Sequence, residues 1–195
     1  KQFVRNYLDE IKWDHKQLSL ENVNSPYRDM REFSTLLNAC GKLNKHDLGI
    51  GALLGDKNSK IMAIHTMSEY KDELTKIMKW YKDGDQDIIK SEKYTIANIR
   101  ERTNPSLIGT MASILSKSSQ FNYDFAVVLG REDENTTKIS IRTNRDINLK
   151  EITQNVFEQI ENSNYGGHEN GFGALIPIEK EEFFIDNIKT ILNKI

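Results

Sequence analysis

The sequence is poor in the residues that make covalently or metal-stabilised folds. Cys40 is the only cysteine among 195 residues, which excludes an internal disulfide and a multi-cysteine zinc site and is typical of a reducing cytoplasm. A lone thiol is usually a small buried hydrophobe, so we expect Cys40 to lie in the core rather than act as a nucleophile. With only three prolines, 37% hydrophobic and 29% charged residues, the composition is globular.

Long apolar runs and a surplus of basic residues are also missing. Mean hydropathy is −0.61 and no apolar run approaches the roughly 20 residues of a membrane span, so we expect no membrane partner. The start at Lys1 shows neither an initiator Met nor a signal peptide, which predicts a piece of a longer cytoplasmic protein. A net charge of −2 argues against broad phosphate neutralisation, so contact with nucleic acid requires a local site.

The spacing of apolar residues predicts that residues 1–90 are mostly helical. Helices are expected at 3–13, 26–41 and 48–54, followed by a long amphipathic helix at 59–82 that ends at the Asp-Gly-Asp sequence after it. The side of the long helix expected to face inward carries Ile61, Ile64, His65, Ser68, Leu74, Ile77, Met78 and Tyr81.

Residues 91–195 alternate between strand-like and helix-like patterns. Continuous apolar runs and strict alternation predict strands, and apolar residues every three or four positions predict helices. The chain is therefore predicted to be α/β (α+β), with a helical N-terminal region followed by a mixed β-sheet flanked by helices. The expected strands are 94–99, 123–129, 137–143 and 174–176, and the expected helices are 107–115, 149–160 and 179–195.

A glycine-rich segment near the C-terminus is the first candidate site. Four of the eleven glycines fall within 166–173, which we predict to be a loop between a helix and a strand. Glycine lets a ligand approach the backbone, and His168 can donate to a phosphate oxygen or stack against a base. The alternative is a loop whose glycines only satisfy turn geometry. The candidate binding residues here are Gly166, Gly167, His168, Asn170, Gly171 and Gly173.

Ser140 and Arg142 are the second candidate site. On an alternating strand these two residues project from the same face. A hydroxyl beside a guanidinium can clasp a phosphate, because the guanidinium fork matches phosphate geometry. The alternative is an ordinary solvated strand face.

Together these motifs resemble the DHHA1 domain of DHH phosphoesterases. The resemblance rests on 166–168, a Gly-Gly-His sequence, preceded by the Ser-Ile-Arg sequence 140–142. The stretches 31–41, 108–115 and 176–185 are similar to the archaeal RecJ-like branch of that family. The resemblance extends over most of the chain and implies a DHHA1-like sheet.

The resemblance implies phosphodiester hydrolysis with Mn²⁺ or Mg²⁺, held by Asp and His residues of an N-terminal DHH domain. The sequence has no Asp-His-His and its four histidines are scattered, so we assign no catalytic residue, metal ligand or cofactor here and expect the metal ligands upstream. By resemblance, Gly166, Gly167 and His168 contact the strand near the scissile phosphate and Arg142 binds a phosphate. Phe172, where the family usually has a small residue, is expected to pack in the core or to stack on a base.

The resemblance therefore implies the substrate-binding part of a RecJ-like single-strand exonuclease, with single-stranded DNA or RNA as partner and no activity of its own. A non-catalytic scaffold associated with the GINS replication complex is the main alternative, since the acidic balance suits a protein partner. Hydrolysis of a small nucleotide is a third reading, and residues 38–41 favour the RecJ-like branch over it. An alanyl-tRNA-synthetase-like editing module shares a related domain, but the zinc-binding His and Cys residues expected in it are absent from this sequence.

Overall fold

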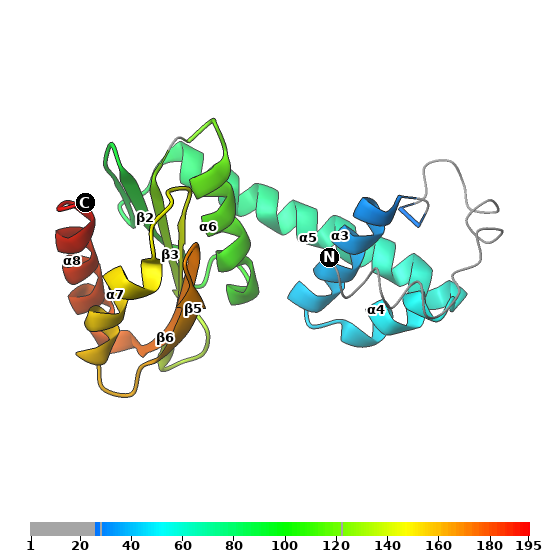
Figure 1. Ribbon diagram of the computed structural model, residues 1–195. Helices are drawn as coiled ribbons and strands as arrows, with labels where there is room; N and C mark the ends of the chain where they lie inside the picture. Colours follow the sequence, from blue (N-terminus) through cyan, green and yellow to red (C-terminus); the bar gives the residue numbers. More distant parts are fainter. Residues whose placement is uncertain (1–25, 28, 122) are drawn as a thin grey trace. The chain divides into compact units, whose positions relative to one another are not determined.

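The computed structural model describes residues 26–27, 29–121 and 123–195 (Figure 1). The helix predicted at 3–13 lies outside the described residues. The chain divides into two compact units, and the boundary between Glu73 and Leu74 falls within one long helix.

In the described part of unit 1, all regular secondary structure is helical. Helix α3 begins after Asp29, whose carboxylate accepts a hydrogen bond from the Arg31 amide at 2.7 Å and so caps the helix. Cys40 is 1% exposed and lies against Gly49 of the next helix, as expected for a core thiol, and burial raises its pKa. The helices are α3 (Met30–Lys42), α4 (His46–Leu53) and the first part of α5 (Lys57–Asp83).

Helix α5 confirms the predicted long helix, but the predicted inward side is wrong in its first half. Ile61 and Ile64 are 56% and 38% exposed, whereas Ala63 and Met67 are buried. Both sets are apolar, and the sequence pattern does not say which one the neighbouring helices cover.

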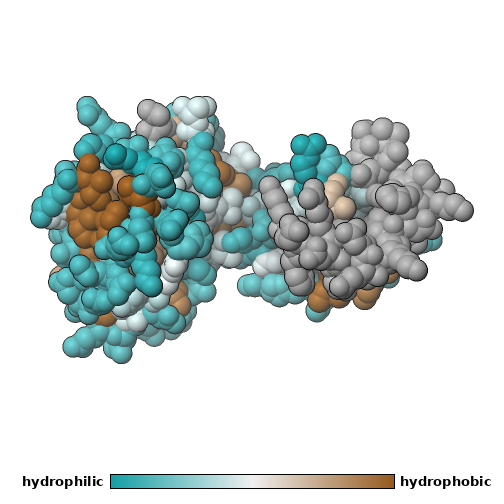
Figure 2. All heavy atoms as spheres, in the orientation of Figure 1, coloured by the Kyte–Doolittle hydropathy of each residue, from teal (hydrophilic) through white to brown (hydrophobic). Residues whose placement is uncertain are grey.

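Most of the visible surface is hydrophilic (Figure 2). None of the helices in the described part of the chain has the length and apolar character of a membrane span.

Unit 2 is a six-stranded mixed sheet in the order β1-β2-β3-β4-β6-β5. Strands β2 and β3 run parallel and every other neighbouring pair is antiparallel. This arrangement confirms the predicted α/β class with a mixed sheet. The strands are β1 (Ile88–Lys90), β2 (Tyr94–Asn98), β3 (Phe125–Arg131), β4 (Thr136–Thr143), β5 (Asn164–His168) and β6 (Gly171–Pro177).

Helices cover both faces of the sheet (Figure 1). Helix α6 packs with the end of α5 on one face, against Ala126 and Val128 of β3. Helices α7 and α8 pack on the opposite face, against Val127 and Leu129 of the same strand. This double burial explains the continuous apolar run of β3. The helices are α6 (Ile108–Lys117), α7 (Leu149–Glu158) and α8 (Glu181–Leu192), with short 3-10 helices at Pro105–Leu107 and Ile178–Lys180.

The glycine-rich segment is a β-hairpin, so the predicted loop is wrong. Strands β5 and β6 pair with each other, and β6 also pairs with β4, so a long-range partner holds these glycines extended. Phe172 is 1% exposed and its ring stacks on that of Phe157 at 5.4 Å. Phe172 is therefore a core residue and does not present its ring to a base.

Candidate functional site

The register of the hairpin aligns most of the predicted site residues on one face of the sheet. Directly opposed residues of neighbouring strands project from the same side. The side that carries Ser140 and Arg142 therefore also carries His168. The two rows across β4, β6 and β5 are Ser140–Gly173–Gly166 and Arg142–Gly171–His168.

Gly171 is the point on which two of these side chains converge. A Cβ built on Gly171 would lie 3.1 Å from Nη1 of Arg142 and 3.2 Å from Cε1 of His168. Both distances are shorter than most real Cβ contacts, so a side chain at this position would displace one of the two groups. The absence of a side chain at residue 171 therefore lets the guanidinium and the imidazole approach each other.

Helix α6 brings a further residue to the same place. A Cβ on Gly109 would lie 3.6 Å from Nη2 of Arg142 and 3.7 Å from Oγ of Ser140, so the first turn of α6 lies beside both side chains. The N-terminus of a helix carries partial positive charge and favours an anion. Gly109 was missed from the sequence, although the helix-start signal at 104–106 could have indicated it. We call Gly109, Ser140, Arg142, His168 and Gly171 the Arg142 cluster.

The hydroxyl of Ser140 has no hydrogen-bond partner. Ser140 is 5% exposed, and its Oγ is the one buried side-chain oxygen or nitrogen that lacks a partner among the residues described. Buried polar atoms are nearly always hydrogen-bonded, because leaving one unpaired costs about 1–3 kcal/mol. The hydroxyl is therefore available to a ligand that reaches the cluster.

The guanidinium of Arg142 is half-buried and lacks a carboxylate partner among the described residues. Its Nη1 donates to the carbonyl oxygens of Ile141, at 2.8 Å, and Phe172, at 3.4 Å. Burial lowers the pKa of Arg142, but an arginine remains charged at neutral pH. The cluster therefore holds a partly desolvated positive charge next to an unpaired hydroxyl.

Two predicted site residues lie apart from this cluster. Gly167 faces the other side of the sheet, where a Cβ would come within 2.4 Å of the Gly171 carbonyl oxygen and 2.7 Å of Cα of Phe172. The absence of a side chain at Gly167 thus permits close packing of the hairpin. Asn170 lies in the exposed turn between β5 and β6.

Comparison with known proteins places this sheet in a family. The family model described as the DHHA1 domain matches residues 91–194. The chain belongs to the DHHA1 family. The matched DHHA1 domain contains every strand from β2 to β6 and all members of the Arg142 cluster. No curated protein sequence matches the chain.

Solved structures share the fold of this DHHA1 chain at low sequence identity. RecJ from Thermus thermophilus in complex with Mg²⁺ is 17% identical, with a TM-score of 0.60 over 84% of this chain and 25% of that chain. A crystal structure of exonuclease RecJ bound to manganese is 17% identical, with a TM-score of 0.59 over 84% of this chain and 40% of that one. A DHH-domain protein described as a member of the s1p family of ribosomal proteins is 12% identical, with a TM-score of 0.50 over 83% and 40%. The chain thus spans between a quarter and two fifths of the length of these proteins.

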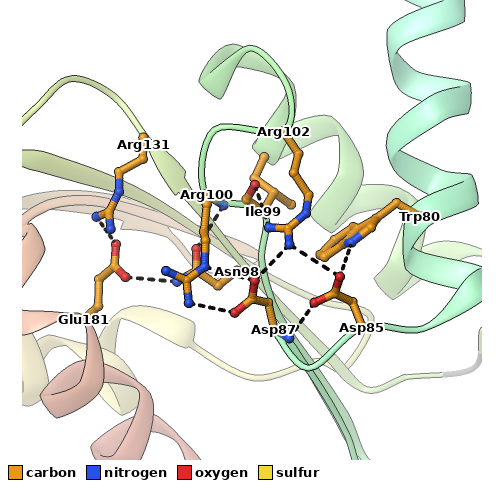
Figure 3. A network of polar contacts seen from close by, with 9 residues as sticks. All are labelled: Trp80, Asp85, Asp87, Asn98, Ile99, Arg100, Arg102, Arg131 and Glu181. Carbon is orange, nitrogen blue, oxygen red and sulfur yellow. Dashed lines mark hydrogen bonds and ion pairs between the residues drawn. The ribbon is translucent and has the colours of Figure 1, made fainter.

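A second group of charged residues in unit 2 is internally neutralised (Figure 3). Arg100 donates to both carboxylate oxygens of Asp87, at 2.8 and 2.9 Å, and Arg102 donates to Asp87 at 3.0 Å. The hydrogen bond from Arg100 and its positive charge hold the pKa of Asp87 below its usual range, and Arg102 adds to the effect. Asp85 accepts from the Trp80 indole at 2.9 Å.

Glu181 completes this network from the N-terminus of α8. Its carboxylate accepts hydrogen bonds from Asn98, Arg131 and Thr137 and ties the helix to three strands. A depression of about 500 Å³ beside the network is lined by the paired charges of Asp87, Arg100, Arg131 and Glu181 and by the exposed carboxylates of Glu179 and Glu182. We therefore assign this network to stability.

The described residues do not fit a two-metal centre. No three side chains of His, Cys, Asp or Glu come together as a metal site in the described part of the chain. His46 and His65 are exposed, and Asp87 already accepts hydrogen bonds from two arginines. Two-metal hydrolysis requires several such ligands converging on one point, and the described residues by themselves do not supply such a centre.

Proposed function

We propose that this chain is the nucleic-acid-binding C-terminal part of a RecJ-like, metal-dependent single-strand exonuclease. The observation that carries the proposal is the pairing of a half-buried guanidinium that lacks a carboxylate with a buried hydroxyl that lacks any partner, Arg142 and Ser140. A phosphate group satisfies both, since it carries negative charge and several acceptor oxygens. Membership of the DHHA1 family and the fold shared with RecJ support a phosphodiester as the source of that phosphate.

The Arg142 cluster would grip the substrate rather than cleave it. Arg142 supplies charge, Ser140 a single hydroxyl, and His168 an exposed imidazole that can donate to a second phosphate oxygen. Cleavage would need Mn²⁺ or Mg²⁺ in a DHH domain that these residues do not include, so we expect the chain alone to bind without hydrolysing. The motifs at 31–41 and 108–115 lead us to favour the archaeal RecJ-like branch.

Titration of the chain with fluorescently labelled single-stranded DNA and RNA at low salt tests the proposal. We expect saturable binding that Arg142→Ala and His168→Ala each weaken. The matched control is Arg145→Ala, which also removes one positive charge just beyond β4 but takes it from an exposed ion pair with Asp124. Equal weakening by the control and by Arg142→Ala would contradict a specific site, and so would binding that neither cluster substitution changes.

A non-catalytic scaffold that binds the GINS complex is the second candidate. The observation in its favour is the net charge of −2 with an isoelectric point near 6.1, which suits a protein partner at least as well as a polyanion. The same titration separates the two functions. A folded chain that binds neither DNA nor RNA but is captured by purified GINS would support the scaffold.

A further inference from the structure

An uncovered part of the sheet adjoins the Arg142 cluster. On the face that carries Ser140, helix α6 packs on β3 and β4. Beside them, Asn164 and Gly166 of the edge strand β5 are exposed on that face. A shallow depression of about 340 Å³ lies there, within the range of about 300–1,000 Å³ typical of small-molecule sites. Its base is the backbone of Gly166 and Gly173, which we call the glycine floor.

Neither backbone conformation nor packing explains the glycine floor. Among the described residues, the glycines with positive φ are Gly55 and Gly84, so Gly166 and Gly173 have a backbone that other residues can adopt. A Cβ on Gly166 would meet no atom within 4 Å, and one on Gly173 would come no closer than 3.6 Å to the Ile139 carbonyl oxygen. Glycine weakens a strand, and within a strand it often marks the close approach of a ligand.

The chemistry of the depression differs from that of the Arg142 cluster. Its side chains on this face are Leu175, the exposed carboxamide of Asn164, and Lys138, whose ammonium group pairs with Glu132 at 2.8 Å. The site therefore offers a flat neutral surface, one apolar flank and one group that both donates and accepts hydrogen bonds. A planar heterocycle with a hydrogen-bonding edge matches these features better than a second phosphate does.

We infer that the glycine floor binds a nucleobase of the strand whose phosphate the Arg142 cluster holds, an inference that rests on the proposed function. The rows of Gly173 and Gly171 are neighbours on the same face, about 7 Å apart along the strand. A base and the phosphate of one nucleotide can therefore occupy the floor and the cluster together. The open floor would accept unpaired bases, so we expect the chain to bind single strands more tightly than duplexes.

Two oligonucleotides with the same backbone test the inference. One is labelled hexathymidylate, and the other is a hexamer of abasic tetrahydrofuran units with the same phosphates. We expect the unaltered chain to bind the base-bearing oligonucleotide about tenfold more tightly. Gly166→Val fills the floor without meeting another atom at its Cβ, so it should abolish this preference. Gly173→Ala is the milder second variant, and Gly41→Ala, which also fills open space, is the control in α3.

The outcomes separate this inference from the proposed function. Failure of both oligonucleotides to bind the unaltered chain would overturn the proposed function and this inference with it. Equal binding of the two would overturn only the base site, as expected if another protein segment covers this face. The inference would also be wrong if Gly166→Val weakened both equally, or if thermal melting showed both floor variants folded and the base preference intact. Arg142→Ala should weaken both oligonucleotides alike.

Discussion

The guanidinium of Arg142 lies in space that any side chain at Gly171 would reach, since a Cβ there would stand 3.1 Å from Nη1. The two residues oppose each other across β4 and β6, and the pairing register fixes their relation. A strand glycine thus determines how an arginine on the neighbouring strand is presented. The consequences for binding and stability can be measured separately.

Replacing Ser140 by Ala should separate binding from stability. The hydroxyl is buried without a partner, so its removal should leave the free energy of unfolding unchanged or raise it by up to about 1 kcal/mol. The same change should weaken oligonucleotide binding. Urea denaturation and anisotropy measure the two effects, and Ser116→Ala is the control. Ser116 is also buried but donates to the Ser113 carbonyl oxygen at 3.3 Å, so its loss should destabilise by about 1 kcal/mol. A clear decrease in the free energy of unfolding of Ser140→Ala would contradict the finding that the Ser140 hydroxyl lacks a hydrogen-bond partner.

Gly166 and its neighbour Gly167 should respond oppositely to alanine. Gly167→Ala forces a Cβ against backbone atoms at 2.4 and 2.7 Å and should lower the free energy of unfolding by about 1–3 kcal/mol. Gly166→Ala meets nothing within 4 Å and should be neutral or slightly stabilising. Thermal or urea denaturation of both variants checks this, and equal effects would show that the hairpin register is wrong.

The stability supplied by Asp87 should depend on pH. Its pKa is held low in the folded state, so the ionised carboxylate stabilises the fold above the unfolded pKa of about 4, and this contribution disappears as pH falls through the folded pKa. Asp87→Asn should therefore lower the free energy of unfolding by about 1–2 kcal/mol at pH 7. The difference from the unaltered chain should shrink below about pH 4, as followed by urea denaturation across pH. If the difference in the free energy of unfolding stayed constant down to pH 2, the charge of Asp87 would not be the source of the stabilisation.

The salt dependence of binding should report the charge of Arg142. Each phosphate neutralised on a single strand adds about −0.7 to the slope of log affinity against log salt concentration. Arg142→Ala should reduce the magnitude of that slope by about 0.7, whereas Arg145→Ala should leave it unchanged. Anisotropy titrations at several salt concentrations measure both slopes. Identical slopes for the two variants would show that Arg142 does not contact a phosphate.

The long helix α5 shows where sequence patterns stop being informative. Its existence and its end at the Asp-Gly-Asp sequence follow from the sequence pattern, and Gly84 there has φ +86°. Its start at Lys57 lies two residues before the predicted one, next to Asp56, whose carboxylate accepts from the Ser59 amide. Its buried side does not, because Ile61 and Ala63 are equally compatible with a helical stripe. Only the helices packed against it decide which of the two lies inside.

The sequence by itself determined most elements of the sheet and the common face of Ser140 and Arg142. These properties depend on side-chain alternation within one strand and on residue types, which are local. Only the tertiary structure decided that the glycine-rich segment is a hairpin, that Phe172 is buried, and that Gly109 reaches the cluster. The physical reason is that β6 pairs with β4, and Gly109 meets Arg142, across some thirty positions of sequence, and a local pattern does not contain that register.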